Sequence, residues 1–431
     1  MGASQATGII PRHLAARVER ALRSSRIVNI VGPRQSGKTT LVRELIQAAR
    51  YITLDDDATR AALELDAYGQ MRAFAEEAKS SSLPIVVDEI QRVPAISLAL
   101  KRLVDADRRP GQYVLTGSSD VFTSGKAYDS LAGRVTTLIL RPLSAPEIMG
   151  AGSCGLLDAV TAAPRDCFRD LPVPRSFRRA ELIDLLARGG FPEIRRLDEP
   201  ERTARYVSYL DSIVERDVAP VARVRKPDLL RRLIDQLASR TAEELNIASL
   251  CGVIGARKET VNDYIDVLSR LGIVHRLGAW AFSGAKREVK SPKLHFMDLG
   301  CATAIRGEDA HSFGPGADPT PLGHLLESFV FTELEKSLPF LLKRWRLYHW
   351  RQANREIDVL AEAPGKLLAL FETKASTAIS ARDFRHIDWF FLEGPGRGHR
   401  GSGFVVYMGQ ELLSFGPGRI GLPLSILWSF A

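Results

Sequence analysis

A glycine-rich segment that ends in lysine and threonine is the first stretch whose residue types and spacing could do chemistry. Its residues are Gly32, Pro33, Arg34, Gln35, Ser36, Gly37, Lys38, Thr39 and Thr40. They fit the pattern G-x-x-x-x-G-K-T, in which the glycines let the backbone turn its N–H groups toward a β-phosphate. Lys38 would reach the β- and γ-phosphates, and the Thr39 hydroxyl would bind Mg²⁺. The pattern predicts a site for ATP and Mg²⁺; a chance glycine-rich turn is the alternative.

Two carboxylates that follow a short apolar run would complete such a site. Residues 83–87 are expected to form a buried strand of a parallel sheet, and Asp88 and Glu89 come directly after it. Asp88 is expected to hold Mg²⁺, and Glu89 to polarise the attacking water as general base. Because neighbouring residues on a strand point to opposite sides, the pair can share one site only where the strand ends and the chain bends.

Two further positions are candidates for the same catalytic group. Residues 112–119 are expected to form a third buried strand, and either Ser118 or Ser119 at its end would orient the hydrolytic water. A Gly-Ser turn without such a role is the alternative. Arg134 is a candidate arginine finger that would stabilise charge on the γ-phosphate, in its own subunit or in a neighbour's site. An ordinary surface arginine explains it equally well.

A second set of charged residues near the C-terminus suggests different chemistry. Asp358 lies in a predicted strand at 355–360, and the next predicted strand runs into Glu372 and Lys374. An Asp followed one strand later by E-x-K suits metal-dependent hydrolysis of phosphodiesters, because two carboxylates can hold Mg²⁺ while the lysine positions or deprotonates water. The alternative is a salt-bridged cluster in a domain that binds DNA without cutting it.

The elements that must position the nucleotide site alternate between strands and helices. A buried strand is predicted at residues 27–31, directly before the phosphate loop. After the loop, apolar residues recur at helical spacing. They are Leu41, Val42, Leu45 and Ile46. A second strand is predicted at 51–55, so strand, loop and helix occur in the order that a phosphate loop requires.

Residues 226–282 show a different pattern, with three amphipathic helices followed by a β-ribbon. The helices are predicted at 228–238, 246–254 and 257–271, and the ribbon at 273–282. This order is that of a winged helix, whose third helix meets base edges or phosphates. The residues at its start are Arg257, Lys258, Thr260 and Asn262. The order predicts DNA binding, and a packing or dimerisation role is the alternative.

Composition places the chain among soluble proteins. Of its 431 residues 45% are hydrophobic, enough for two to four domains, and no apolar run approaches the roughly 20 residues of a membrane span. The N-terminus lacks the apolar core of a signal peptide, so we expect a cytoplasmic protein without a membrane partner. Its cysteines are far apart and are expected to be reduced thiols. The net charge of +8 favours a polyanionic partner.

Several of these motifs together resemble a known family. GPRQSGKTTL, VVDEIQ, YVLTGSS and LAGRVTTLILRPLSAPEI, then GGFPE at 189–193 and ERDV at 215–218, are similar in this order to a group of bacterial and archaeal AAA-superfamily P-loop ATPases. The C-terminal half of that family carries a domain long described as of unknown function and related to restriction endonucleases. AAA-type relatives often form rings, so the resemblance implies a homo-oligomer in which Arg134 would act on a neighbour.

The resemblance also covers the C-terminal charged residues. REIDVL and LALFETKAS are similar to the motif of restriction-endonuclease-like folds, and Glu327 stands on the helix where such folds often add an acidic metal ligand. Ile357 replaces the proline of many such nucleases. The resemblance therefore implies a metal site at Glu327, Asp358 and Glu372.

The expected fold class is α/β, with a parallel-sheet ATPase and several smaller parts. The expected domains are an AAA-type core (1–148), a variable linker (149–179), a helical lid (180–225), a winged helix (226–285) and a restriction-endonuclease-like domain (286–431). The expected function is a Mg²⁺-dependent ATPase that couples hydrolysis to remodelling or processing branched or structured DNA. A slow ATP-gated switch that binds a protein partner or an operator, with a non-catalytic C-terminal domain, is the alternative.

Overall fold

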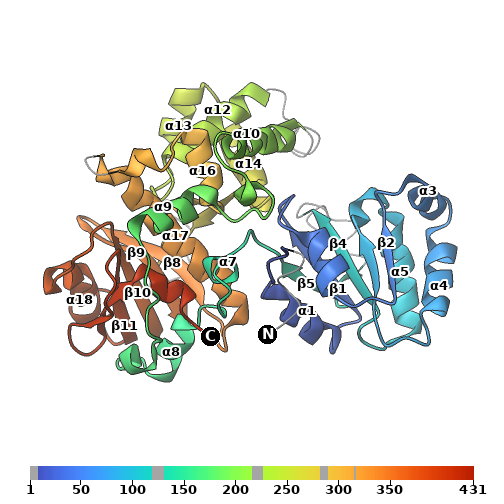
Figure 1. The fold of residues 1–431 in the computed structure, drawn as a ribbon, viewed down its shortest axis with the longest axis horizontal. Helices are drawn as coiled ribbons and strands as arrows, with labels where there is room; N and C mark the ends of the chain where they lie inside the picture. Colours follow the sequence, from blue (N-terminus) through green and yellow to red (C-terminus); the bar gives the residue numbers. More distant parts are fainter. Residues whose placement is uncertain (1–7, 119–130, 216–226, 282–289, 315–316) are drawn as a thin grey trace. The chain divides into compact units, whose positions relative to one another are not determined.

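The structure, a computed structural model, describes residues 8–118, 131–215, 227–281, 290–314 and 317–431 (Figure 1). The chain divides into two compact units, Met1–Leu143 with Arg270–Gly272 and Ser144–Ser269 with Ile273–Ala431. Within the described ranges, no helix combines the length and the apolar character that a membrane span requires.

The first unit is built on a parallel sheet, in which the described strands have the order β2-β3-β4-β1-β5 (Figure 1). They are β1 (Ile27–Gly32), β2 (Arg50–Thr53), β3 (Ile85–Asp88), β4 (Tyr113–Ser118) and β5 (Val135–Ile139). All residues of β1 and β3 are buried, which explains their continuous apolar runs. Because every pair is parallel, all strands end at the same edge. The predicted parallel sheet is confirmed.

Helices connect these strands. They are α1 (Leu14–Leu22), α2 (Lys38–Thr40), η1 (Leu41–Leu45), α3 (Asp57–Leu65), α4 (Ala67–Glu77), η2 (Ile90–Arg92) and α5 (Ala95–Ala106). The helix after the phosphate loop is shorter than its apolar pattern predicted, because α2 continues only as the π-helical turn η1 and Ile46 is already extended. Asp56 accepts a hydrogen bond from the Thr59 N–H and caps α3.

The second unit contains a mixed sheet, in which the described strands have the order β12-β13-β11-β10-β9-β8. They are β8 (Arg346–Gln352), β9 (Arg355–Ala363), β10 (Leu367–Lys374), β11 (Arg400–Tyr407), β12 (Leu413–Ser414) and β13 (Arg419–Pro423). Alternate residues of β10 serve two cores. Phe371 packs in the core that includes α17 (Pro319–Ser337), whereas Leu370 packs in the core that includes α18 (Arg385–Leu392). The sheet therefore has an apolar helical layer on each face (Figure 1).

Many shorter helices complete the described part of this unit. They are α7 (Ala145–Ile148), α8 (Leu156–Ala162), η3 (Cys167–Asp170), α9 (Arg179–Arg188), η4 (Ile194–Arg196), α10 (Glu201–Ile213), α12 (Pro227–Ser239), α13 (Ile247–Ile254), α14 (Lys258–Arg270), α16 (Leu299–Arg306), η6 (His311–Phe313), η7 (Leu338–Phe340), η8 (Ala381–Phe384) and η9 (Leu424–Trp428). The predicted linker at 149–179 is not a spacer. Leu157 and Val160 of α8 and Cys167 are buried in the core that α17 and β10 share. Its elements are too short to show a periodic pattern, which is why the sequence did not reveal them.

The structure also differs from the prediction of a β-ribbon at 273–282. Its first strand is β6 (Val274–Leu277), but the partner of β6 is β7 (Lys293–Phe296), with His275 opposite His295 in an antiparallel pair. The sequence had assigned residues 293–296 to the C-terminal domain. Two short strands of similar composition do not reveal from spacing alone which strand pairs with which.

Candidate functional site

The phosphate loop joins β1 to α2 through residues with unusual backbone angles. Gln35 has φ 60° and Gly37 has φ 93°, so the chain passes twice through the left-handed region before α2 begins. Gly32 is required for space, since a Cβ there would lie 2.1 Å from the Leu140 carbonyl oxygen. Such a turn exposes successive N–H groups to an anion. Arg34, Thr39 and Thr40 are exposed on this loop and the first turn of α2.

Lys38 and Ser36 show how the loop fits a nucleotide. The Lys38 ammonium is buried and donates to the carbonyl oxygens of Gly32 at 3.0 Å and Pro33 at 2.8 Å. The Ser36 hydroxyl is buried and has no hydrogen-bond partner in the described part of the chain. The Lys38 ammonium and the Ser36 hydroxyl are groups that can donate hydrogen bonds to phosphate oxygens. The residues present therefore fit ATP, and the Thr39 hydroxyl at the exposed end of the loop fits Mg²⁺.

Asp88 ends β3 and is held by two hydroxyl groups. Tyr51 donates to Asp88 Oδ2 at 2.6 Å, and the buried Thr116 hydroxyl donates to Oδ1. Burial and the bond to Asp88 raise the pKa of Tyr51 above its ordinary value, so this phenol remains a donor. Asp88 itself is 1% exposed. The carboxylate is thus fixed in orientation, as a ligand of Mg²⁺ must be.

Glu89 lies at a bend, as the sequence predicted for a pair that shares one site. Its backbone is left-handed, with φ 61° and ψ 43°, and its N–H donates to the Thr116 hydroxyl at 3.1 Å. The Gln91 side-chain amide donates to the Glu89 carboxylate. Thr116 therefore connects both acidic residues: it donates to the carboxylate of Asp88 and accepts from the backbone of Glu89.

Arg134 is not near the phosphate loop of its own chain. Its carbonyl accepts from the Ile27 N–H, so it lies at the beginning of β1, whereas the loop follows the end of that strand. Its guanidinium binds Asp105 through Nε at 2.6 Å and Nη2 at 2.8 Å. This placement contradicts an arginine finger acting in the same subunit; a role in a neighbour's site stays a prediction. Ser119 lies outside the described residues, and Ser118 is the last residue of β4.

Sequence reasoning missed three residues of the nucleotide site. Tyr51 and Thr116 became visible only once β2 and β4 were seen to flank β3. Thr116 carried a signal, because it is a hydroxyl residue in the otherwise apolar run of β4. Arg12 carried none. It is buried, and its guanidinium donates to the Ser36 carbonyl at 2.7 Å and to the Arg141 carbonyl at 2.6 Å, which joins the phosphate loop to the chain after β5.

In the second unit, a lysine lies among the carboxylates that were predicted to bind a metal. Lys293 Nζ is 2.6 Å from Glu327 Oε1, 2.5 Å from Glu356 Oε1 and 3.8 Å from Asp358 Oδ1, and its side chain is 3% exposed. Burial is the main cause that raises the pKa of Asp358 and of Glu327, and the ammonium opposes this rise. Burial alone would lower the pKa of Lys293, but the carboxylates raise it. The group is a buried ion cluster with its own cation.

Glu372 is electrostatically coupled to that cluster, since its negative charge adds to burial in raising the pKa of Glu327 and of Asp358. Its carboxylate is 3.5 Å from Lys374 Nζ and 3.4 Å from His386 Nδ1, on the α18 side. In the ranges that the structure describes, no group of three or more His, Cys, Asp or Glu side chains is arranged to hold a metal ion. The metal centre at Glu327, Asp358 and Glu372 stays a prediction, and the structure places the ammonium of Lys293 beside two of these three residues. The arrangement matches the alternative, a salt-bridged cluster.

The predicted DNA-contacting residues gather on the first turns of α14. Helix α13 ends at Gly255, whose left-handed backbone has φ 69°, and α14 begins three residues later. Arg257 and Lys258 are exposed, and Thr260 is half-buried. The Asn262 amide donates to the Lys258 carbonyl at 3.0 Å, so one of its donors is used inside the helix. A short turn that contains Gly255 therefore joins α13 to α14.

Comparison with known proteins agrees with the first unit. The family described as "AAA domain" matches residues 24–149, and two families described as domains of unknown function, DUF8612 and DUF4143, match residues 179–312 and 322–427. The phosphate loop and the acidic pair at one edge of a parallel sheet define a P-loop ATPase of the AAA superfamily.

The uncharacterized proteins Rv2008c of Mycobacterium tuberculosis and Mb2031c of Mycobacterium bovis are each 30% identical to the chain over 382 residues, which cover 87% of this chain and 76% of theirs. The chain belongs to the same family as these two mycobacterial proteins. An uncharacterized protein of Haemophilus influenzae is 24% identical over 365 residues, covering 79% of this chain and 80% of that protein. The structure of Aeropyrum pernix ORC1 in complex with DNA matches with a TM-score of 0.26 and 16% identity, covering 70% of this chain and 95% of that one.

Thr116→Val tests the connection between the two acidic residues. The substitution keeps the shape but removes the hydroxyl that binds Asp88 and Glu89. We expect the rate of ATP hydrolysis or the affinity for Mg²⁺ to fall roughly 10–100-fold, which is the range found when groups that orient metal ligands are removed. Thr137→Val, an exposed threonine on β5, is the matched control. Full activity of Thr116→Val would contradict the assignment.

Lys293→Met tests the ion cluster by its pH dependence. Losing the ammonium leaves buried carboxylates without a cation, which costs about 3–5 kcal/mol of unfolding free energy. The folded-state pKa values of Asp358 and Glu327 already lie above their ordinary values, so the folded variant is favoured when they are protonated. Its unfolding free energy should therefore fall as pH rises above the unfolded pKa of about 4. Urea unfolding from pH 5 to 8 measures this. A loss of unfolding free energy that is constant from pH 5 to 8, or that is equal in the exposed-site control Lys343→Met, would contradict the assignment of a buried ion cluster.

Proposed function

We propose that the protein is a Mg²⁺-dependent ATPase that binds DNA and couples its nucleotide cycle to DNA binding. The observation that carries the ATPase part is the arrangement of Asp88, Glu89 and Thr116 at the edge where the phosphate loop begins. When bound at the phosphate loop, MgATP would supply the phosphoryl group that is transferred to water and a divalent charge that stabilises its negative oxygens. Everything else in the reaction is positioning by residues of this chain.

Each residue of the site has a role that follows from its present contacts. Lys38 would exchange the Gly32 and Pro33 carbonyls for phosphate oxygens. Asp88, oriented by two hydroxyls, would hold Mg²⁺ or its water. Glu89 would accept a proton from the attacking water. These roles explain why one alternating strand can end in two carboxylates that act together.

The DNA part of the proposal is supported by α13 and α14. A helix-turn-helix with Arg257 and Lys258 exposed at the start of its second helix presents cations where phosphates or base edges are read. The net charge of +8 adds a general attraction for a polyanion. Cleavage is not part of the proposal, because Lys293 forms ion pairs with the carboxylates that would have to hold a metal. The preference for branched or structured DNA, and assembly into a homo-oligomer, stay predictions from the family resemblance.

A second candidate is a slow ATP-gated switch that binds a protein partner. The ion cluster favours this candidate, since a C-terminal domain whose carboxylates form ion pairs with an internal lysine suits a scaffold better than an enzyme. The two candidates differ in whether DNA changes the rate of ATP hydrolysis.

ATP hydrolysis by the full chain, alone and with linear, forked or four-way DNA, tests the proposal. We expect DNA to stimulate hydrolysis, Lys38→Ala to abolish it, and Glu89→Gln to bind ATP without turnover. Hydrolysis that no DNA changes would favour the switch. Unchanged turnover in Glu89→Gln would contradict the assignment of the general base.

DNA binding by α14 is tested with the double variant Arg257→Ala and Lys258→Ala. If both cations contact phosphates, affinity should fall for every sequence, and the slope of log K against log salt should decrease by about 2, roughly one per lost contact. Binding is measured by fluorescence anisotropy at several salt concentrations. The control is Lys343→Ala with Arg344→Ala, an adjacent exposed basic pair in the same unit. Equal effects of both double variants would contradict a specific role for α14.

A further inference from the structure

A glutamine beside the general base of the proposed ATP site holds one oxygen of that base. Gln91 lies on η2, two residues after Glu89, and both residues are half-buried. The Gln91 amide nitrogen donates a hydrogen bond to Glu89 Oε2. Because a carboxylate can only accept, the amide nitrogen has to face Glu89, and the amide oxygen has to face away from it. The bond therefore fixes both the orientation of the Gln91 amide and one oxygen of Glu89.

The amide oxygen of Gln91 is left without a hydrogen bond. It is buried and has no partner within the part of the chain that the structure describes. A buried acceptor that is not satisfied destabilises the fold, and an apolar side chain of the same length would avoid that cost. Packing alone therefore does not explain a glutamine at this position, whereas the hydrogen bond to Glu89 does.

Strand β4 leaves room for the Gln91 side chain at a glycine. A Cβ on Gly117 would lie 2.9 Å from Gln91 Oε1, too close for either group to stay in place. Gly117 pairs with Val31 of β1, and the next pair joins Ser118 to Gly32, the first residue of the phosphate loop. Gln91 thus reaches from the segment after β3 to the end of β4 that is paired with the start of the phosphate loop.

The second oxygen of Glu89 remains available for chemistry. Among the described residues, none donates a hydrogen bond to Glu89 Oε1. A general base acts only when it lies within hydrogen-bond reach of the proton that it takes. Holding one carboxylate oxygen limits where the other can lie, and such positioning accounts for much of the rate of an enzyme reaction.

We propose that Gln91 is a positioning residue of the ATP site: its amide holds Glu89 Oε2 and leaves Glu89 Oε1 to accept from the attacking water, and Gly117 provides the space that this arrangement needs. The inference rests on the function proposed above. It gives Gln91 of VVDEIQ and Gly117 of YVLTGSS a common role.

Gln91→Met tests the proposal, because methionine has a similar length and no hydrogen-bond donor. The kcat of ATP hydrolysis is measured at saturating MgATP, and the Kd is measured separately with a fluorescent ATP analogue. We expect kcat to fall roughly 10–100-fold and the Kd to stay unchanged, since the interaction that is lost orients the base and does not bind the nucleotide. An unchanged Kd also shows that the variant is folded. An unchanged or higher kcat, or a loss that lies only in the Kd, would overturn the proposal.

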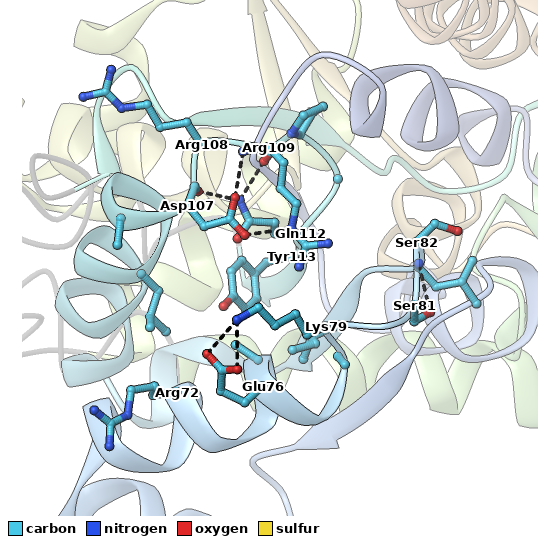
Figure 2. Close-up of a pocket in the computed structure, with 18 of the residues that line it drawn as sticks. Arg72, Glu76, Lys79, Ser81, Ser82, Asp107, Arg108, Arg109, Gln112 and Tyr113 are labelled. Carbon is cyan, nitrogen blue, oxygen red and sulfur yellow. Dashed lines mark hydrogen bonds and ion pairs between the residues drawn. The ribbon is translucent and has the colours of Figure 1, made fainter.

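Gln112→Met is the matched control. Gln112 is also a half-buried glutamine, and its amide donates hydrogen bonds to the carbonyls of Asp107 at 2.8 Å and Arg109 at 2.6 Å. It directly precedes β4, so it lies at the edge of the sheet opposite the nucleotide site (Figure 2). The substitution should leave kcat unchanged. A fall as large as that in Gln91→Met would contradict a specific role for Gln91.

Gly117→Ala moves the Gln91 side chain without changing its chemistry and provides a second test. We expect kcat to fall while the Kd stays unchanged. In the double variant Gly117→Ala and Gln91→Met, kcat should be no lower than in Gln91→Met alone, because both changes remove the same hydrogen bond. Losses that multiply in the double variant would overturn the proposal.

These outcomes can be told apart from a failure of the proposed function. If the unchanged protein does not hydrolyse ATP, or if Glu89→Gln keeps full turnover, the ATPase assignment and the role of Gln91 fail together. If hydrolysis requires Glu89 but Gln91→Met keeps full kcat, only the role of Gln91 fails.

Discussion

Parallel pairing of β1, β3 and β4 is the constraint on which the nucleotide site depends. Strand β4 lies between the other two, so the phosphate loop and Asp88 are held on one edge with Thr116 between them. The same constraint requires β3 to stop at Asp88, because a continued strand would turn Glu89 to the opposite face. A left-handed glutamate is strained by about 1–3 kcal/mol, and its hydrogen bond to Thr116 helps to hold it there. The strain therefore lies at the residue assigned as general base.

In the second unit, Lys293 supplies a buried positive charge among Glu327, Glu356 and Asp358. Two carboxylates that are buried close together repel one another and need a cation, whether bound or built in. Lys293 sets one positive charge against three carboxylates, and its ion pairs join α17 to β9.

Local patterns allowed the sequence to predict the phosphate loop, the acidic pair with its bend, and the order of strands and helices around them. Contacts between distant segments could not be predicted. Arg12 reaches the loop from before α1, and Lys293 reaches α17 and β9 from a ribbon whose pairing the sequence misassigned. Hydrophobic spacing also failed for α8, because a helix this short completes too few turns to show its period. That strand ends meet at one edge of a parallel sheet could be predicted, because this follows from the parallel arrangement and does not depend on the loops.

The position of Lys293 also limits how a nucleotide signal could reach DNA. Its strand, β7, pairs with β6 of the ribbon that follows α14, while its ammonium binds α17 and β9. Just after β7, Asp298 caps α16. Its carboxylate also accepts hydrogen bonds from the Gly190 N–H at 2.6 Å and from the Tyr206 hydroxyl at 2.9 Å. The GGFPE segment at 189–193 is therefore bonded to the residue that follows the ribbon. Shifting the ribbon against α17 would separate buried charges, at a cost of about 3–5 kcal/mol. A movement of the ribbon alone is therefore unfavourable, and the proposed coupling of ATP hydrolysis to DNA binding would have to move the ribbon together with α17 and β9.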